Sequence, residues 1–171
     1  MYVEEFPLAL NLDVDRVREL IGRWRENPSE AGLVARRLAL AIARDHLACG
    51  HDVIVPQHLG RPEFIEQLER LAAEVGVRFD EIVLLDSKDS ALRRYHRRGE
   101  AAEDPAHADA QEMVDRGGGP KWLEAMYDRL LASLPMRPRA TVIPTHEGDE
   151  FRTFRDLLER LSQPGPNDRR S

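Results

Sequence analysis

The sequence predicts an α/β fold, a three-layer αβα arrangement in which a parallel sheet lies between two layers of helices. Short apolar segments that suit buried strands alternate with longer segments whose apolar residues recur every three or four positions, as in helices. The segment Ile82–Asp86 is apolar at four successive positions, which is typical of a central parallel strand covered on both faces. Such alternation predicts right-handed crossover units and a parallel sheet.

Four segments are expected to be strands. The first is an apolar run that includes Pro7 and ends at an acid, and the other three follow helical segments. These strands are predicted at Phe6–Asp13, Asp52–Pro56, Ile82–Asp86 and Ala140–Pro144.

Helices are predicted between and after the strands, with ends marked by proline, serine or glycine. The helix that starts at Val14 has Val14, Val17, Leu20 and Ile21 on its apolar face and stops near Pro28. The next runs from Ser29 to Gly50, with an apolar face made of Leu33, Val34, Leu38, Ala41, Ile42 and Leu47. The remaining helices are predicted at 62–76, 88–98, 121–134 and 149–161, with Ser87 as the N-cap of the second of these. The inner face of the helix 62–76 is predicted to consist of Phe64, Ile65, Leu68, Leu71 and Ala72.

The 171-residue length suits one domain, which we place at residues 1–161. Residues 99–120 are rich in alanine, acids and glycine and are predicted to form an exposed excursion. Residues 162–171 contain no large apolar side chain and are predicted to be a disordered tail.

Composition excludes several classes of protein. The formal net charge of −6 argues against a dedicated nucleic-acid or membrane-surface protein, so a nucleic-acid partner is not expected. No apolar run approaches the roughly 18 residues of a membrane-spanning helix. Cys49 is the only cysteine, which favours the reducing cytoplasm. The basic residues are 23 arginines and only two lysines, Lys88 and Lys121.

Charged residues at the end of the first predicted strand are the best candidates for chemistry. Function in parallel sheets gathers outside the carboxyl ends of the strands. Asp13 and Asp15 follow the first strand, and Arg18 lies one helical turn after Asp15. A carboxylate there could take a proton from a substrate hydroxyl, while an arginine holds an anion. The alternative is that an acid caps the helix and pairs with its neighbour.

A second candidate group is the arginine-rich end of the predicted helix 88–98. Arg94 and Arg98 are four residues apart and lead into the glycine-rich excursion, where they could bind a transferring phosphate. A solvated charged face is the alternative. The six histidines show no spacing typical of a metal site, so no metal ligands are assigned. Trp24 and Trp122 are interpreted as packing residues.

Together these segments resemble small P-loop kinases, the ATP-binding proteins grouped with nucleotide kinases, zeta toxins, chloramphenicol phosphotransferase and AAA family ATPases. The resemblance is carried by the run Leu8–Arg18, the strand that ends at Gln57, and Ile82–Asp86 with its arginine-rich helix. It implies a fold of the P-loop nucleoside triphosphate hydrolase type, with ATP and Mg²⁺ as cofactors and a small hydroxyl-bearing molecule or nucleotide as substrate.

The resemblance also implies roles for individual residues. Asp15, and with it Asp13, would face the phosphoryl acceptor. Arg18, Gln57 and Arg61 would bind the acceptor. Arg94 and Arg98 would contact the ATP phosphates, residues 99–120 would form the lid, and residues 145–148 would lie near the adenine.

The chain departs from this family in two ways. Pro56-Gln57 stands where the family often has an aspartate that helps to hold magnesium. The first strand and the GxxxxGK[ST] phosphate loop are missing, and Gly117–Lys121 does not replace them because a proline and Trp122 occupy key positions. Residues 1–6 resemble the last turn of the family's first helix.

Two explanations follow from the missing loop. In the first, the protein extends upstream of Met1, and in-frame DNA there encodes the loop. In the second, the chain is a non-catalytic binding or regulatory relative that has lost ATP binding. Under either explanation, the 171-residue chain is expected to bind ATP poorly.

Overall fold

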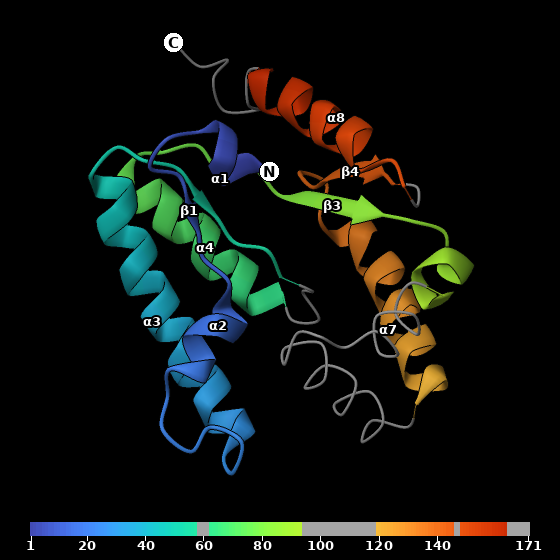
Figure 1. Ribbon diagram of the computed structural model, residues 1–171, viewed down its shortest axis with the longest axis horizontal. Coiled ribbons are helices and arrows are strands. Elements are labelled where there is room, and N and C mark those ends of the chain that lie inside the picture. The colour runs from blue at the N-terminus through green and yellow to red at the C-terminus, as the bar shows by residue number, and fades with distance from the viewer. Residues whose placement is uncertain (58–61, 94–118, 146–147, 164–171) are drawn as a thin grey trace. The chain divides into compact units, whose positions relative to one another are not determined.

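The computed structural model describes residues 1–57, 62–93, 119–145 and 148–163, and the chain forms two compact units, Met1–Phe79 and Asp80–Ser171. Each unit contains one pair of parallel strands with helices (Figure 1). The predicted α/β class and the parallel pairing are therefore confirmed. The four strands form two separate two-stranded sheets in the described residues, not the single sheet that the sequence predicts.

The first unit begins with a short helix and contains the strand pair β1–β2. Leu10 pairs with Val53 and Asn11 with Ile54 in parallel register. The ladder continues where the Leu12 N–H donates to the carbonyl oxygen of Ile54 at 2.8 Å. The elements are α1 (Tyr2–Glu5), β1 (Leu10–Asn11), α2 (Val14–Glu19), α3 (Pro28–Ala48), β2 (Val53–Ile54) and α4 (Pro62–Val75).

The strand predicted at Phe6–Asp13 is wrong over its first half. Residues 6–9 form a turn, in which Leu8 has a positive φ of 67° and the Ala9 N–H donates to the carbonyl oxygen of Phe6. The His46 ring nitrogen Nε2 lies 2.7 Å from the carbonyl oxygen of Leu8 and ties this turn to α3. The extended pairing therefore starts only at Leu10.

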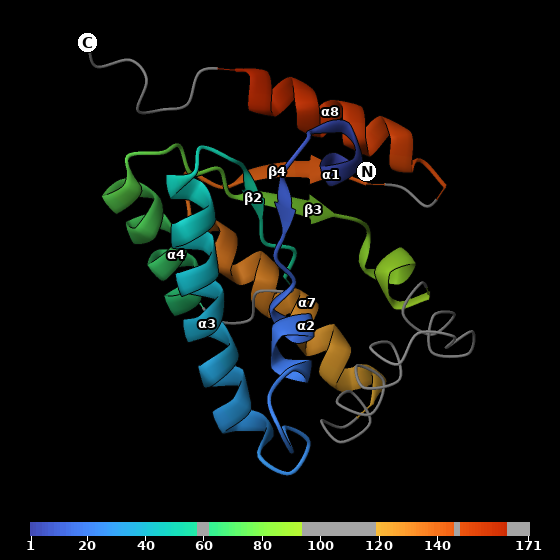
Figure 2. The same cartoon turned by 60° about the vertical axis from the view of Figure 1, so that its left-hand side comes forward.

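The apolar face predicted for α3 is also wrong. The side that packs into the unit consists of alanines at every fourth position, and Ala35 and Ala39 are 0% exposed. Leu33, Val34, Leu38 and Ile42 are exposed instead. Small residues let α3 lie close to α2 and α4, and α3 and α4 lie side by side in both views (Figures 1 and 2). The buried cluster of this unit is Leu12, Val14, Val17, Ala35, Ala39, Ala43, Phe64 and Leu71.

The other helices of this unit follow the sequence more closely. α4 buries Phe64, Ile65 and Leu71 as predicted. α2 buries Val14 and Val17 but ends at Glu19, and Leu20, expected on its inner face, is exposed. α3 and α4 are followed by Gly50 and Gly76, both with a positive φ that suits a helix end.

The second unit contains the parallel pair β3–β4, in register from Ile82 with Thr141 to Leu85 with Pro144. Residues 88–93 are helical, and Ser87 caps them, since its Oγ accepts the Ser90 N–H. Leu84 is 56% exposed, so the prediction that this strand is covered on both faces is wrong for the described residues. The elements are β3 (Ile82–Leu85), α7 (Pro120–Ser133), the 3₁₀ turn η1 (Leu134–Met136), β4 (Thr141–Pro144) and α8 (Glu150–Ser162).

Within the described ranges, no helix is both long enough and apolar enough to cross a bilayer. α3 is the longest helix, at 21 residues, and it carries five acidic or arginine side chains between Glu30 and Asp45.

The alanine side of α3 gives a matched pair of variants. Ala39→Leu inserts a side chain where no space is free, and we expect it to lower the free energy of unfolding by about 1–3 kcal/mol. Leu33→Ala removes an exposed side chain and should change it by less than about 0.5 kcal/mol. Both residues favour helix, so propensity does not separate them. Urea unfolding followed by circular dichroism measures both, and a larger loss for Leu33→Ala would contradict this packing.

Candidate functional site

Asp13 stands at the end of β1 and begins α2. Its Oδ1 accepts the Asp15 N–H at 2.9 Å, and its carbonyl oxygen accepts the Val17 N–H, the first bond of the helix. Asp13 is therefore the N-cap of α2, which is the structural alternative given by the sequence. This capping fixes where α2 starts and hence where Asp15 and Arg18 stand relative to the strand.

Asp15 and Arg18 share one face of α2, as their spacing predicts. Arg18 Nη1 lies 3.3 Å from Asp15 Oδ1. The Asp15 side chain is 58% exposed, whereas that of Arg18 is only 15% exposed. The pair thus combines a carboxylate that solvent or a substrate can reach with a guanidinium that is held largely inside the protein.

Trp24 completes this site, and sequence analysis missed it. The guanidinium carbon of Arg18 lies 4.6 Å from the centroid of the Trp24 ring, and that of Arg25 lies 4.4 Å from the same centroid. Cation–π attraction of this kind holds a guanidinium plane over a ring. The sequence alone predicts only a packing role for Trp24. α2 ends at Glu19, so helical spacing does not relate Arg18 to Trp24, and this contact has no sequence signal.

The turn that carries Trp24 has an unusual backbone. Arg23 has a positive φ of 56°, which costs free energy for a residue with a side chain. Arg23 Nη2 also pairs with Glu26 Oε2 at 2.6 Å. The Arg23–Glu26 ion pair and hydrogen bonds along residues 21–27 hold the turn, which keeps the Trp24 ring beside Arg18.

One donor of Arg18 has no acceptor. Its Nε is buried, and no described residue accepts a hydrogen bond from it. Arg137 in the second unit shows the usual arrangement: it is also 15% exposed, but its Nε donates to Glu81 at 2.8 Å. A buried donor without a partner costs about 1–3 kcal/mol, and more when it is charged. An anion whose oxygen reached Arg18 Nε would recover this cost.

Gln57 lies at the same edge of the β1–β2 pair as Asp13. The strands are parallel, so their carboxyl ends point to one edge, and Gln57 follows β2 after Val55 and Pro56. Its side chain is half-buried. The other predicted site residues, Arg61, Arg94 and Arg98, lie outside the described residues, as does most of the predicted lid.

The strand ends of the second unit carry buried polar residues. Asp86, Ser90 and Thr145 are each less than a tenth exposed. Asp86 Oδ1 accepts the Ser87 N–H at 2.7 Å, and its carbonyl oxygen accepts the Tyr127 hydroxyl at 2.7 Å. These bonds attach the end of β3 to α7 and are structural.

Lys88 follows the same strand and is already engaged. Its Nζ donates to both carboxylate oxygens of Asp128, at 2.9 and 2.8 Å. The hydrogen bond that Lys88 donates to Asp128 raises the pKa of Lys88 above its ordinary value. One of the two lysines of the chain is therefore tied to α7, which leaves it poorly suited to bind a phosphate.

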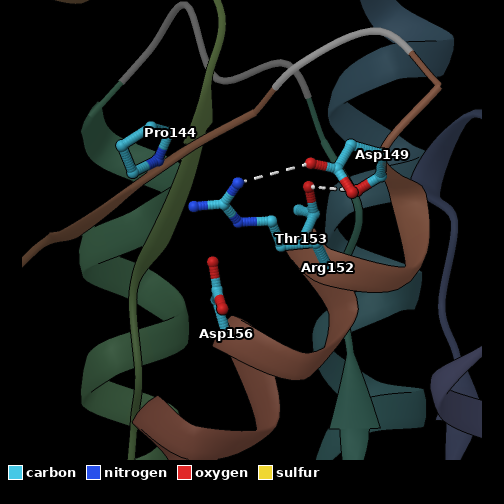
Figure 3. A pocket seen from close by; sticks show the side chains of 5 residues that line it. All are labelled: Pro144, Asp149, Arg152, Thr153 and Asp156. Atoms are coloured by element: carbon cyan, nitrogen blue, oxygen red, sulfur yellow. Dashed lines mark hydrogen bonds and ion pairs between the residues drawn. The ribbon is translucent and has the colours of Figure 1, made fainter.

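A small hollow lies beside the end of β4 (Figure 3). Its volume is about 80 Å³, and its lining includes Pro144, Asp149 and Arg152. The Arg152 side chain extends between the carboxylates of Asp149 and Asp156, with Nη1 3.7 Å from Asp149 Oδ2. Ligand pockets usually measure about 300–1,000 Å³, so this hollow alone is too small for a nucleotide base.

The described residues contain no group of three or more histidine, cysteine, aspartate or glutamate side chains that could hold a metal ion. Asp13 and Asp15 are adjacent to each other, but they are used in the cap and in the pair with Arg18. The comparisons with known proteins add no relative: no family model, curated protein or solved structure matches this chain.

The unpartnered donor predicts an unusual stability effect. Arg18→Met removes a buried N–H that has no acceptor and should change the free energy of unfolding by less than about 1 kcal/mol in either direction. Arg137→Met leaves Glu81 buried without its cation and should cost about 3 kcal/mol. Urea unfolding compares the two variants. Equal losses would mean that Arg18, like Arg137, serves mainly to hold the fold together.

Proposed function

We propose that this chain carries the acceptor-binding side of a phosphotransferase of the P-loop kinase type. The observation that supports it is Arg18, a guanidinium held between Asp15 and the Trp24 ring, with a buried Nε–H that lacks an acceptor among the described residues. A guanidinium fixed in this way, with a donor still open, suits the recognition of an anionic acceptor. The acceptor is a small hydroxyl-bearing molecule or a nucleotide with an anionic group.

In this proposal Arg18 binds the acceptor and Asp15 acts as the base. Arg18, with Gln57 and Arg61, binds and orients the acceptor. Asp15 is exposed and ion-paired, so its carboxylate can accept the proton of the acceptor hydroxyl. Arg94 and Arg98 stabilise the charge on the transferred phosphoryl group. The proposed fold is the three-layer αβα arrangement of P-loop proteins, and the parallel pairing of the strands within each unit is compatible with it.

ATP and Mg²⁺ are the cofactors that the resemblance implies, but the described residues do not fit them. The sequence has no GxxxxGK[ST] loop, Lys88 is bound to Asp128, and no cluster of metal ligands lies in the described ranges. The described residues therefore support no reaction step that uses ATP. The same observations favour the second candidate function, a non-catalytic domain that binds the anion without transferring phosphate.

Trp24 reports on binding at Arg18. Arg18 Nε is covered, so an anion can reach it only if the side chains around it move, and the fluorescence of Trp24 should then change. In a Trp122→Phe background Trp24 is the only tryptophan. We expect a nucleoside monophosphate to give a saturable change with a dissociation constant below about 1 mM. Arg18→Gln should weaken binding about tenfold or more.

Two further variants complete this experiment. Arg93→Gln removes an exposed arginine of the second unit and should leave binding unchanged. Asp15→Asn should retain binding, because it removes a negative charge next to the ligand. No saturable change with the monophosphate or with inorganic phosphate, or equal affinity in Arg18→Gln, would contradict an anion site. A variant with a GxxxxGK[ST] segment added before Met1 tests catalysis. If that variant binds the monophosphate but transfers no phosphoryl group, the non-catalytic alternative is favoured.

A further inference from the structure

Helix α3 carries two apolar faces, and only one of them is used inside the first unit. The alanine face is buried, as described above. On its outer side Val34, Leu38 and Ile42 recur every four residues and are 36%, 44% and 40% exposed. We call these three residues, with the exposed Ala41, the outer stripe. Single exposed apolar residues are normal, but a continuous stripe along one helix marks an interaction surface.

Two charged residues flank this stripe in a symmetric way. Arg37 and Asp45 are both exposed, and Ala41 stands midway between them. Within the described part of the chain, neither side chain has an ion-pair or hydrogen-bonding partner. The neighbouring Arg44, by contrast, pairs with Glu74 of α4. Among the described residues the surface thus offers one positive and one negative side chain without a partner, four residues on either side of a small residue.

We propose that the outer stripe binds the same stripe of a second copy of this chain, with the two α3 helices antiparallel and crossing at Ala41. In a two-fold pair, residues equally far from the axis face each other. Arg37 of each copy would then meet Asp45 of the other, so the dimer would contain two such ion pairs. Ala41 at the axis permits close approach of the helices. By the same rule Leu38 of each copy would pack against the aliphatic part of Arg44 of the other copy, and Ile42 against Leu40.

The charge pattern favours a second copy over an unrelated partner. Arg37 and Asp45 have opposite charges and lie equally far from Ala41. A two-fold rotation about Ala41 therefore brings each of them opposite its counterpart in an identical helix. An unrelated partner would need to supply the same spacing with inverted charges. The inference is independent of the proposed function, because the outer stripe lies on α3 and shares no residue with the Asp15–Arg18–Trp24 site.

Charge exchange tests the pairing. We expect the wild-type chain to be a dimer in analytical ultracentrifugation at about 100 μM, with a dissociation constant in the micromolar range or below. Arg37→Glu and Asp45→Arg should each raise that constant about tenfold or more, since each places like charges opposite one another. The double variant, Arg37→Glu with Asp45→Arg, restores the complementary pairs and should return the constant to within about threefold of wild type.

Further variants make the result specific to the stripe. Leu38→Gln should weaken the dimer about tenfold, whereas Met136→Gln, at an equally apolar and more exposed residue of the second unit, should not. In a Cys49→Ser background, Ala41→Cys should form a disulfide-linked dimer on mild oxidation and Leu33→Cys should not. Circular dichroism verifies that each variant is folded, as expected for exposed positions.

Three results would overturn the proposal. The first is a wild-type chain that is monomeric at 100 μM. The second is a dimer that none of the stripe variants weakens, which would place the interface elsewhere. The third is a double charge variant as weak as the single ones, which would exclude the antiparallel pairing of Arg37 with Asp45.

Discussion

The close packing of α3 through its alanine face is the constraint on which the first unit depends. Alanines at every fourth position let the helix lie close to α2 and α4, around Leu12, Val14 and Phe64. Close packing of this kind tolerates little change in volume. Because Leu12 and Val14 belong to the buried cluster, the chain between them is fixed at both sides. Asp13 lies there, and its cap sets the position of Asp15 and Arg18 one turn later.

Sequence patterns predicted the elements well and their faces less well. The parallel pairing, the start of α2 at Val14, the Ser87 cap and the inner face of α4 follow from spacing and end signals. The face of α3 could not be predicted in this way. Hydrophobicity increases with side-chain size, so a search for the most apolar face of the helix selects Leu33, Val34, Leu38 and Ile42. The alanines are buried because their small volume permits close helix packing, which hydrophobicity does not measure. The exposure of those larger residues is what points to a second binding surface.

The candidate site shows the same division. The spacing of Asp15 and Arg18 predicts their ion pair, because it lies within one helix. The contact of Arg18 with Trp24 depends on a turn in which Arg23 adopts a positive φ, a conformation that the sequence does not signal. The buried Nε without an acceptor is likewise a property of the packed structure. Helical spacing thus predicts the pair of Asp15 and Arg18. The Trp24 ring and the unpartnered Nε–H of Arg18 become visible only in the packed structure.

The central claim is that Arg18 uses its unpartnered Nε–H to bind an oxygen of an anionic ligand. Nuclear magnetic resonance of the arginine Nε–Hε groups tests it directly during titration with a nucleoside monophosphate. The Arg18 Hε signal should move downfield as it gains an acceptor, while that of Arg137, already bound to Glu81, should stay in place. An unchanged Arg18 signal at saturating ligand, or equal shifts of both signals, would contradict the account.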